Sequence, residues 1–200
     1  MFLSLTSPAF ASTSHNYVNL SELASLQANN PDNIRAVLED GLTVSDSSPT
    51  ARHYFEDGSY IELSIYVPQT SNEQKSNLRV QTTSTRTASV SLSGKSTVTG
   101  DTLVMWTYTL YQDYQSNGTR ITWYEDSPYS SFDSPFYSAW TLDSETVSTG
   151  NNPDDSNGIR ATSSIKCSFG IWEIRPQSVS AKLTLDIEGD GSYTGYTTWL

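Results

Sequence analysis

Cysteine is almost absent from this 200-residue chain, and its scarcity restricts the chemistry available. Cys167 is the only cysteine, so no disulfide can form within the chain and no cluster of cysteines can hold a metal ion. Cys167 lies in an alternating apolar stretch, which predicts a small buried side chain. A cysteine nucleophile would need a histidine beside it, and the only histidines are His15 and His53. We therefore do not expect cysteine chemistry.

Positive charge and long apolar runs are scarce as well. Lys and Arg number 11 against 22 Asp and Glu, which gives a formal net charge of −11. A chain this acidic repels phosphate backbones and anionic membrane surfaces, so nucleic acid is not an expected partner. No stretch approaches the roughly 18 apolar residues of a membrane span, so we expect no integral membrane segment.

Small hydroxyl side chains and aromatic rings are abundant instead. The chain has 33 serines and 24 threonines, and aromatic residues make up 12% of it. Threonine and tyrosine favour strands, while serine is common in turns and on solvated strand faces. This mixture predicts a mainly β protein whose outer sheet faces are in contact with water.

The first eleven residues, MFLSLTSPAFA, resemble the end of a secretory signal. Ala9 and Ala11 have the small-x-small spacing of a signal-peptidase site, and Pro8 interrupts the segment before them. We interpret residues 1–11 as a signal-peptide remnant. Export without disulfides favours a secreted, extracellular protein of bacterial type.

The only helical signals fall in residues 12–50. Asn19 and Glu22 have the spacing of a capping-box variant, which predicts a short helix through Gln27. Asn30 and Pro31 have the types preferred at a helix N-cap and first turn, and Gly41 supplies the stop. These residues predict one or two short helices before a β domain over 51–200.

From Arg52 onward the apolar pattern has a period of two, which indicates strands. The expected strands are Arg52–Phe55, Tyr60–Val67, Leu78–Leu92, Asp101–Gln115, Arg120–Glu125, Ala139–Thr149 and two more after the turn-rich segment 151–158. Residues 127–138 read as a loop rich in proline, serine and aromatic residues. About 7–9 strands at these spacings predict an antiparallel β-sandwich or a partly closed barrel.

Aromatic residues are concentrated between residues 106 and 140. Tyr and Trp combine a large apolar face with a polar group, so half-exposed members can stack on sugar rings or anchor a partner, although core packing is equally ordinary for a strand Trp. The predicted ligand-binding residues are Trp106, Trp123, Tyr124, Tyr129, Tyr137 and Trp140.

Two oxygen-rich loops raise the possibility of calcium. Asp154, Asp155 and Asn157 lie in a turn-rich loop and are the predicted metal ligands, with a hydrated surface loop as the alternative. The second segment, Asp186 to Gly191, has acidic residues at alternate positions as in the first half of an EF-hand, but Thr197 stands where the glutamate belongs. No other cofactor is expected.

No catalytic motif is present: the chain lacks G-x-S-x-G, H-E-x-x-H, a P-loop and G-x-G-x-x-G. Whether the chain is an enzyme stays open, with a binding role favoured and no catalytic residue predicted. We expect a secreted module that binds a glycan or another cell-surface ligand. The alternatives are a pore-forming protein, because 81–99 is rich in Ser and Thr and alternates weakly, and a hydrolase on a β scaffold.

Overall fold

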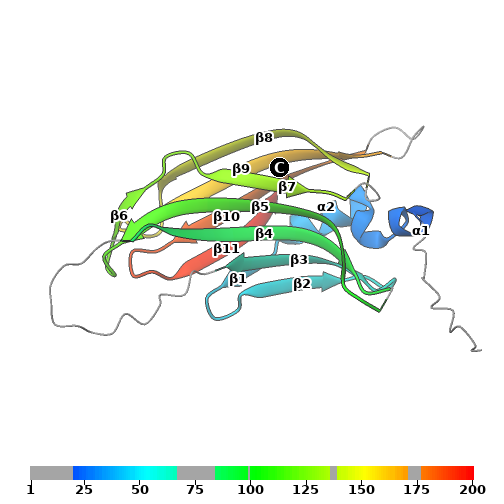
Figure 1. The fold of residues 1–200 in the computed structure, drawn as a ribbon, viewed down its shortest axis with the longest axis horizontal. Coiled ribbons are helices and arrows are strands. Elements are labelled where there is room, and N and C mark those ends of the chain that lie inside the picture. Colours follow the sequence, from blue (N-terminus) through cyan, green and yellow to red (C-terminus); the bar gives the residue numbers. More distant parts are fainter. Residues whose placement is uncertain (1–19, 67–83, 99, 136–138, 171–176) are drawn as a thin grey trace, which may run out of the picture.

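The computed structural model describes residues 20–66, 84–98, 100–135, 139–170 and 177–200. In these residues two antiparallel sheets form a sandwich, with short helices at one end, and the sheets do not close into a barrel (Figure 1). The prediction of a mainly β sandwich is therefore confirmed. Among the described residues, no helix is both long and apolar enough to cross a membrane.

The two sheets are built from strands that are far apart in the sequence. The strands of sheet A are β1 (Thr43–Ser45), β8 (Trp140–Asn151), β9 (Ile159–Phe169), β10 (Gln177–Ile187) and β11 (Tyr193–Trp199). The strands of sheet B are β2 (Thr50–Tyr54), β3 (Ser59–Tyr66), β4 (Arg86–Ser96), β5 (Leu103–Ser116), β6 (Ile121–Tyr124) and β7 (Tyr129–Asp133). Sheet A has the order β1-β11-β10-β9-β8, and sheet B has the order β2-β3-β4-β5-β6, with β7 also paired to β5.

The N-terminal segment contains the two predicted helices, but the first ends at Ala24 rather than Gln27, and its predicted cap, Asn19, lies outside the described residues. It forms α1 (Leu20–Ala24), the 3-10 turn η1 (Gln27–Asn29) and α2 (Pro31–Asp40). The side-chain oxygen of Asn30 accepts the backbone N–H of Asp32 at 2.9 Å, and Gly41 ends α2 with a φ of 77°. Helix α2 then packs with its buried side on β10 and β11.

The core lies between the sheets because most of the long strands alternate apolar and polar residues. On β5, for example, Tyr108 and Leu110 are fully buried, while Thr107 and Tyr111, which flank them, point away from the core. The same alternation places these inward residues in the core: Ile61, Leu63, Ile65, Ala88, Val90, Leu92, Ile159, Ala161, Ile165, Val179, Ala181, Leu183, Leu185 and Ile187.

Two tryptophans join the sheets to the N-terminal segment. Trp106 comes from β5 of sheet B and Trp140 from β8 of sheet A, and their ring centroids lie 6.0 Å apart. The indole N–H of Trp106 donates to the carbonyl of Ala28 at 3.2 Å, and that of Trp140 donates to the side-chain oxygen of Asn29 at 3.1 Å. Asn29 is itself fully buried, so its hydrogen bonds replace the water that it has lost.

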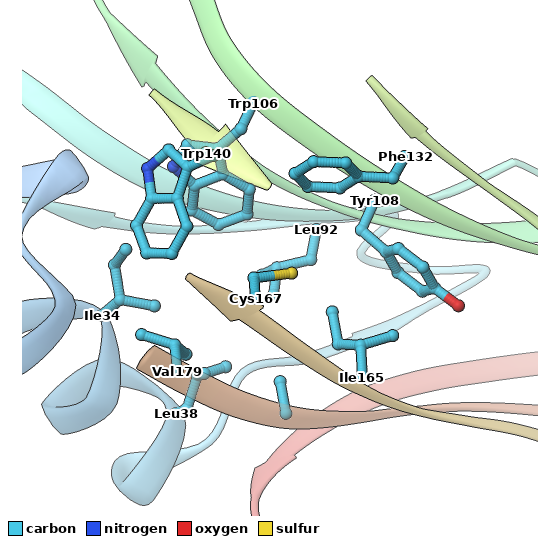
Figure 2. Close-up of a pocket in the computed structure, with 11 residues that line it drawn as sticks. Ile34, Leu38, Leu92, Trp106, Tyr108, Phe132, Trp140, Ile165, Cys167 and Val179 are labelled. Carbon is cyan, nitrogen blue, oxygen red and sulfur yellow. The ribbon is translucent and has the colours of Figure 1, made fainter. Parts of the chain in front are cut away.

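A small cavity remains beside these indoles (Figure 2). Its volume is about 30 Å³, and it lies between α2, which contributes Ile34 and Leu38, and the two sheets. The walls are apolar, so a water molecule would find no hydrogen-bond partner there. Cys167 borders the cavity, and burial raises the pKa of its thiol to about 12, which matches the predicted inert side chain. The space is far smaller than an ordinary ligand pocket.

Three strands were not predicted from the sequence, and each has a physical reason. Strand β7 falls inside the expected loop 127–138 and directs only Phe132 firmly toward the core. Strand β11 places Gly195 and Thr197 at inward positions, so it lacks an apolar alternation. Strand β1 is three residues long. The described residues therefore form eleven strands where 7–9 were expected, and β1 pairs with β11 although it belongs to the segment 12–50.

We predict that Gly94→Ala destabilises the fold by about 2 kcal/mol, because overpacking of this size is typical of a core that cannot expand. Gly94 is the cross-strand neighbour of Trp106, and a Cβ at residue 94 would lie 2.3 Å from the indole nitrogen. Urea unfolding measures the change. The matched control is Gly150→Ala, also in a strand, where a Cβ meets nothing within 4 Å and the effect should stay within about 0.5 kcal/mol. Equal losses for the two variants would contradict the packing argument.

Candidate functional site

The outer side of sheet B carries an ordered set of side chains that we call the tyrosine face. The face is contributed by β3, β4, β5 and β7, whose registers align it in rows across the strands. The first row is Tyr66, Ser89, Tyr111 and Tyr129; the second is Ser64, Ser91, Thr109 and Ser131; the third is Glu62, Ser93, Thr107 and Asp133.

The first row contains two exposed aromatic rings. Tyr66 is 65% exposed and Tyr129 is 48% exposed. Tyr129 stacks on Tyr111 with the ring centroids 4.9 Å apart and the planes 8° from parallel. Stacking fixes the orientation of both rings, so little side-chain entropy remains to be lost when a ligand binds.

Hydroxyl groups cover the second and third rows. Ser91 and Thr109 share a hydrogen bond of 2.9 Å between their hydroxyls, and the hydroxyl of Thr107 donates to that of Ser93 at 3.1 Å. Cross-strand hydroxyl pairs of this kind stabilise a sheet. Ser93 and Thr109 are buried, so the hydroxyls that solvent can reach are those of Ser64, Ser91, Thr107 and Ser131. These hydroxyls offer donors and acceptors beside the aromatic row.

A charged cluster limits the tyrosine face at the end opposite the first row. Glu62 is almost fully buried and accepts hydrogen bonds from Lys95 and, at 2.5 Å, from Arg52. Burial alone would raise the pKa of Glu62, but the hydrogen bonds from Lys95 and Arg52 outweigh it and hold the pKa below its ordinary value. Arg52 also lies over the ring of Tyr60, 5.6 Å from its centroid, so this cluster is internally satisfied.

Trp123 borders the tyrosine face on the short strand β6. It pairs with Gln115, which points outward from β5, and it is 42% exposed. Gln115 lies four residues from Tyr111 along β5, a separation of about 13 Å at roughly 3.3 Å per residue. Tyr124, the next residue, points to the other side and packs against the core.

The predicted ligand-binding residues separate into three groups. Trp123 and Tyr129 lie at the outer surface of sheet B, and Tyr124 is half-buried at its edge. Trp106 and Trp140 are core residues whose polar groups bond within the protein, so they are not available to a surface ligand. Tyr137 lies outside the described residues. Sequence reasoning did not select Tyr66 and Tyr111, although their outward positions in alternating strands were the signal that would have found them.

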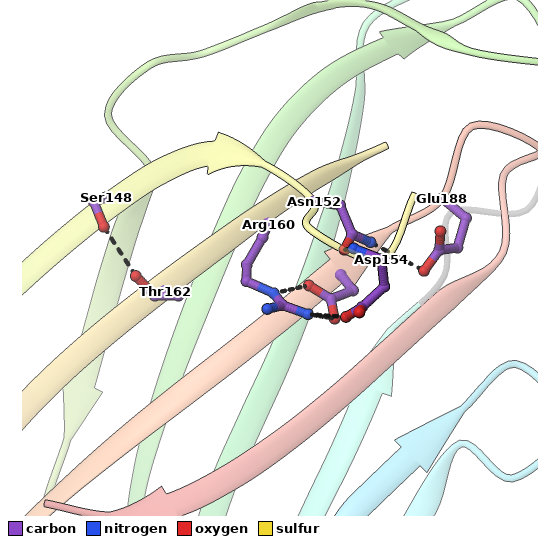
Figure 3. A network of polar contacts seen from close by, with 7 residues as sticks. Ser148, Asn152, Asp154, Arg160, Thr162 and Glu188 are labelled. Carbon is purple, nitrogen blue, oxygen red and sulfur yellow. Dashed lines mark hydrogen bonds and ion pairs between the residues drawn. The ribbon is translucent and has the colours of Figure 1, made fainter. Parts of the chain in front are cut away.

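Two of the three predicted calcium ligands, Asp154 and Asp155, accept hydrogen bonds in the described structure, and Figure 3 shows the contact of Asp154. Asp154 accepts a hydrogen bond from Arg160 at 2.9 Å, and Arg160 also bonds Asp186 at 2.6 Å. Asp155 accepts the backbone N–H groups of Gly189 and Asn157. Among the described residues, no three His, Cys, Asp or Glu side chains are grouped to hold a metal ion. Calcium binding at Asp154, Asp155 and Asn157 stays a prediction.

Titratable groups that a hydrolase would use are not brought together around an open space in the described residues. His53 is exposed on β2 and packs its ring edge on Phe55, 5.0 Å away. Tyr108 bonds Glu145 and Ser163 between the sheets, and burial, followed by Glu145, raises the pKa of its hydroxyl. A Tyr108 hydroxyl that stays neutral is suited to hydrogen bonding between β5 of sheet B and β8 of sheet A.

The Ser/Thr-rich segment 81–99 supplies the central strand β4, apart from residues 81–83 and 99, which lie outside the described residues. β4 pairs with β3 on one side and β5 on the other, and its apolar residues Ala88, Val90 and Leu92 are in the core. Transfer of this segment into a bilayer would require both ladders and the core to break.

Comparison with protein-family models, with curated proteins and with solved structures finds no match to this chain.

We predict that Glu188→Gln raises the melting temperature at pH 7 by about 1–2 °C, because it removes a partly buried negative charge. Burial first, and then the neighbouring Asp155, raises the pKa of Glu188, while hydrogen bonds from Gly189 and Asn157 lower that of Asp155. An acid with a raised pKa begins to destabilise the folded state once the pH exceeds its unfolded-state pKa, and the penalty is complete above the raised folded-state pKa. The gain should therefore shrink as the pH falls through that window.

Thermal unfolding at pH 7 and at pH 4 measures the difference. Glu56→Gln, which removes the same charge from an exposed turn, is the control and should show no pH-dependent gain. A gain for Glu188→Gln that is equal at both pH values would contradict the assignment.

Proposed function

We propose that this protein is a carbohydrate-binding module whose ligand lies across the tyrosine face. The observation that supports the proposal is the row in which Tyr66 and Tyr129 are exposed and Tyr111 stacks on Tyr129, beside partly exposed serine and threonine hydroxyls. Sugar rings present an apolar face of C–H groups and an edge of hydroxyls. Aromatic rings match the first and hydroxyl rows match the second.

Trp123 indicates a ligand longer than one sugar. It lies on the same side of sheet B as the stacked pair Tyr111 and Tyr129, about 13 Å away along β5. One ring cannot contact both places, whereas an oligosaccharide can follow the strand from one to the other. Several contacts along one chain also raise the affinity that single stacked rings would give alone.

The charge of the face favours a neutral glycan. Asp113 lies between Tyr111 and Gln115 on β5, and Asp133 ends the third row on β7. The positive charges of Arg52 and Lys95 are already engaged by Glu62. A polyanionic polysaccharide would meet uncompensated negative charge on the face and in the protein as a whole, which has a net charge of −11.

A role in binding surface glycans is consistent with export, which we propose from the signal-like residues 1–11 and from the scarcity of cysteine. In this proposal the protein acts outside a bacterial cell and recognises polysaccharide without cleaving it.

We predict that Tyr66→Ala and Tyr129→Ala each weaken glycan binding at least tenfold, a loss of about 1.4 kcal/mol, because each removes one stacking ring. A panel of neutral cell-wall polysaccharides identifies the ligand, and calorimetry with its oligosaccharides gives the affinities. Trp123→Ala should weaken binding of long oligosaccharides more than of disaccharides.

The matched control is Tyr54→Ala. Tyr54 is 62% exposed on the edge strand β2, close to the 65% of Tyr66, but its ring packs on Tyr60 in the charged cluster. Circular dichroism establishes that each variant is folded. Binding that survives the loss of Tyr66 and Tyr129, or that Tyr54→Ala reduces equally, would contradict the tyrosine face as the site.

A further inference from the structure

A polar cleft lies between β6 and the turn that joins β8 to β9, at the end of the sandwich away from the helices (Figure 1). Its volume is about 280 Å³, just below the range of roughly 300–1,000 Å³ typical of sites for drug-sized molecules. The side chains that line it are mostly polar: Arg120, Ile121, Tyr124, Asn151, Ser156, Asn157 and Ile159, with Gly158.

The backbone around the cleft is held in place before any ligand arrives. The N–H of Ile121 donates to the carbonyl of Asn157 at 2.9 Å, which ties the two walls together across the sheets. The side-chain oxygen of Asn117 accepts the N–H groups of Thr119 and Arg120, which fixes the turn that carries Arg120. A cleft built in this way loses little entropy when it binds a small molecule.

Glycine makes this arrangement possible at residue 189. A Cβ on Gly189 would lie 2.6 Å from the Cβ of Asn157 and 2.7 Å from the carbonyl oxygen of Thr119. Both contacts are closer than real Cβ atoms approach, so only glycine allows the turns on either side of the cleft to pack against β10 and β11.

Arg120 supplies the only formal charge among the residues that line the cleft. Within the described part of the chain it makes no ion pair, in contrast to Arg35, Arg52 and Arg160, each of which bonds a carboxylate. Because no carboxylate of the described residues occupies it, the Arg120 guanidinium can bind an anionic group of a ligand. It is a fixed donor fork that matches a carboxylate in two parallel hydrogen bonds.

The remaining polar groups of the lining are also available. Asn151, Ser156 and Asn157 are exposed, and in the described structure their side chains make no hydrogen bond, nor does the hydroxyl of Tyr124. Amide and hydroxyl groups can both donate and accept, which suits a ligand that carries several hydroxyls.

We propose that this cleft binds a small hydroxylated carboxylate of the uronic-acid class, with its carboxylate on Arg120 and its hydroxyls on Asn157 and Ser156. The site is separate from the tyrosine face. It takes a negatively charged ligand, whereas the tyrosine face favours neutral sugars. The proposal therefore does not depend on glycan binding by the face. It gives the protein a second specificity, for an acidic sugar or an acidic chain end.

The test is titration of the folded protein with glucuronate, followed by amide chemical shifts, with glucose and acetate as parallel probes. Glucuronate should bind with a millimolar dissociation constant and shift the amides of Arg120, Ser156 and Asn157. Glucose lacks the carboxylate and acetate lacks the hydroxyls, so each should bind at least tenfold more weakly. Arg120→Gln should weaken glucuronate binding at least tenfold, and Arg120→Lys should weaken it less.

Lys182→Gln is the matched control, since it removes one positive charge from the outer side of sheet A and should leave glucuronate binding unchanged. Equal affinity for acetate would overturn the hydroxylated class, and equal affinity for glucose would overturn the role of the carboxylate. Absence of glucuronate binding, or binding that Arg120→Gln leaves unchanged, would overturn the site itself.

Discussion

The contact between Trp106 and Trp140 is the interaction on which the rest of the structure depends. It joins β5 to β8 across the sandwich, and both indole N–H groups bond to the turn at Ala28 and Asn29, so three separate parts of the chain meet there. The bonds satisfy polar groups that would otherwise cost about 1–3 kcal/mol each when buried. Gly94 leaves the space into which the Trp106 ring fits. The sandwich is thereby fixed at its helical end without a disulfide.

With the sheets fixed, the alternation along β5 determines what the protein presents to solvent. The same strand sends Tyr108 and Leu110 into the core and points Thr109 and Tyr111 to the outer side of sheet B, where Tyr111 is partly exposed and Thr109 is covered. Because the neighbouring strands are in register, outward residues of β3, β4 and β7 align with those of β5. A rigid aromatic row beside hydroxyl rows is a direct consequence. The proposed glycan site is thus built on sheet strands, which hold side chains more precisely than loops do.

The sequence predicted the features that depend on local pattern. The Asn30 cap, the Gly41 stop and the longer strands were foreseen, because capping and period-two alternation are local signals. The division of the aromatic residues between core and surface was not foreseen. Trp106 and Trp123 differ in the side of sheet B on which their side chains lie, and that side is set by strand pairing. The row Tyr66, Tyr111 and Tyr129 combines three strands distant in sequence, and β7 lay in an expected loop. Pairing between strands that are distant in the sequence produces no local sequence pattern from which it could be predicted.

The central claim is that the outer side of sheet B is the glycan-binding surface, and amide chemical-shift mapping with a bound neutral oligosaccharide tests it most directly. The account predicts that the largest shifts fall on β3, β4, β5 and β7 around Tyr66, Ser89, Tyr111 and Tyr129, with a second set near Trp123. The outer side of sheet A, around Thr162 and Thr184, should show none. Shifts confined to sheet A or to the helical end would contradict the account.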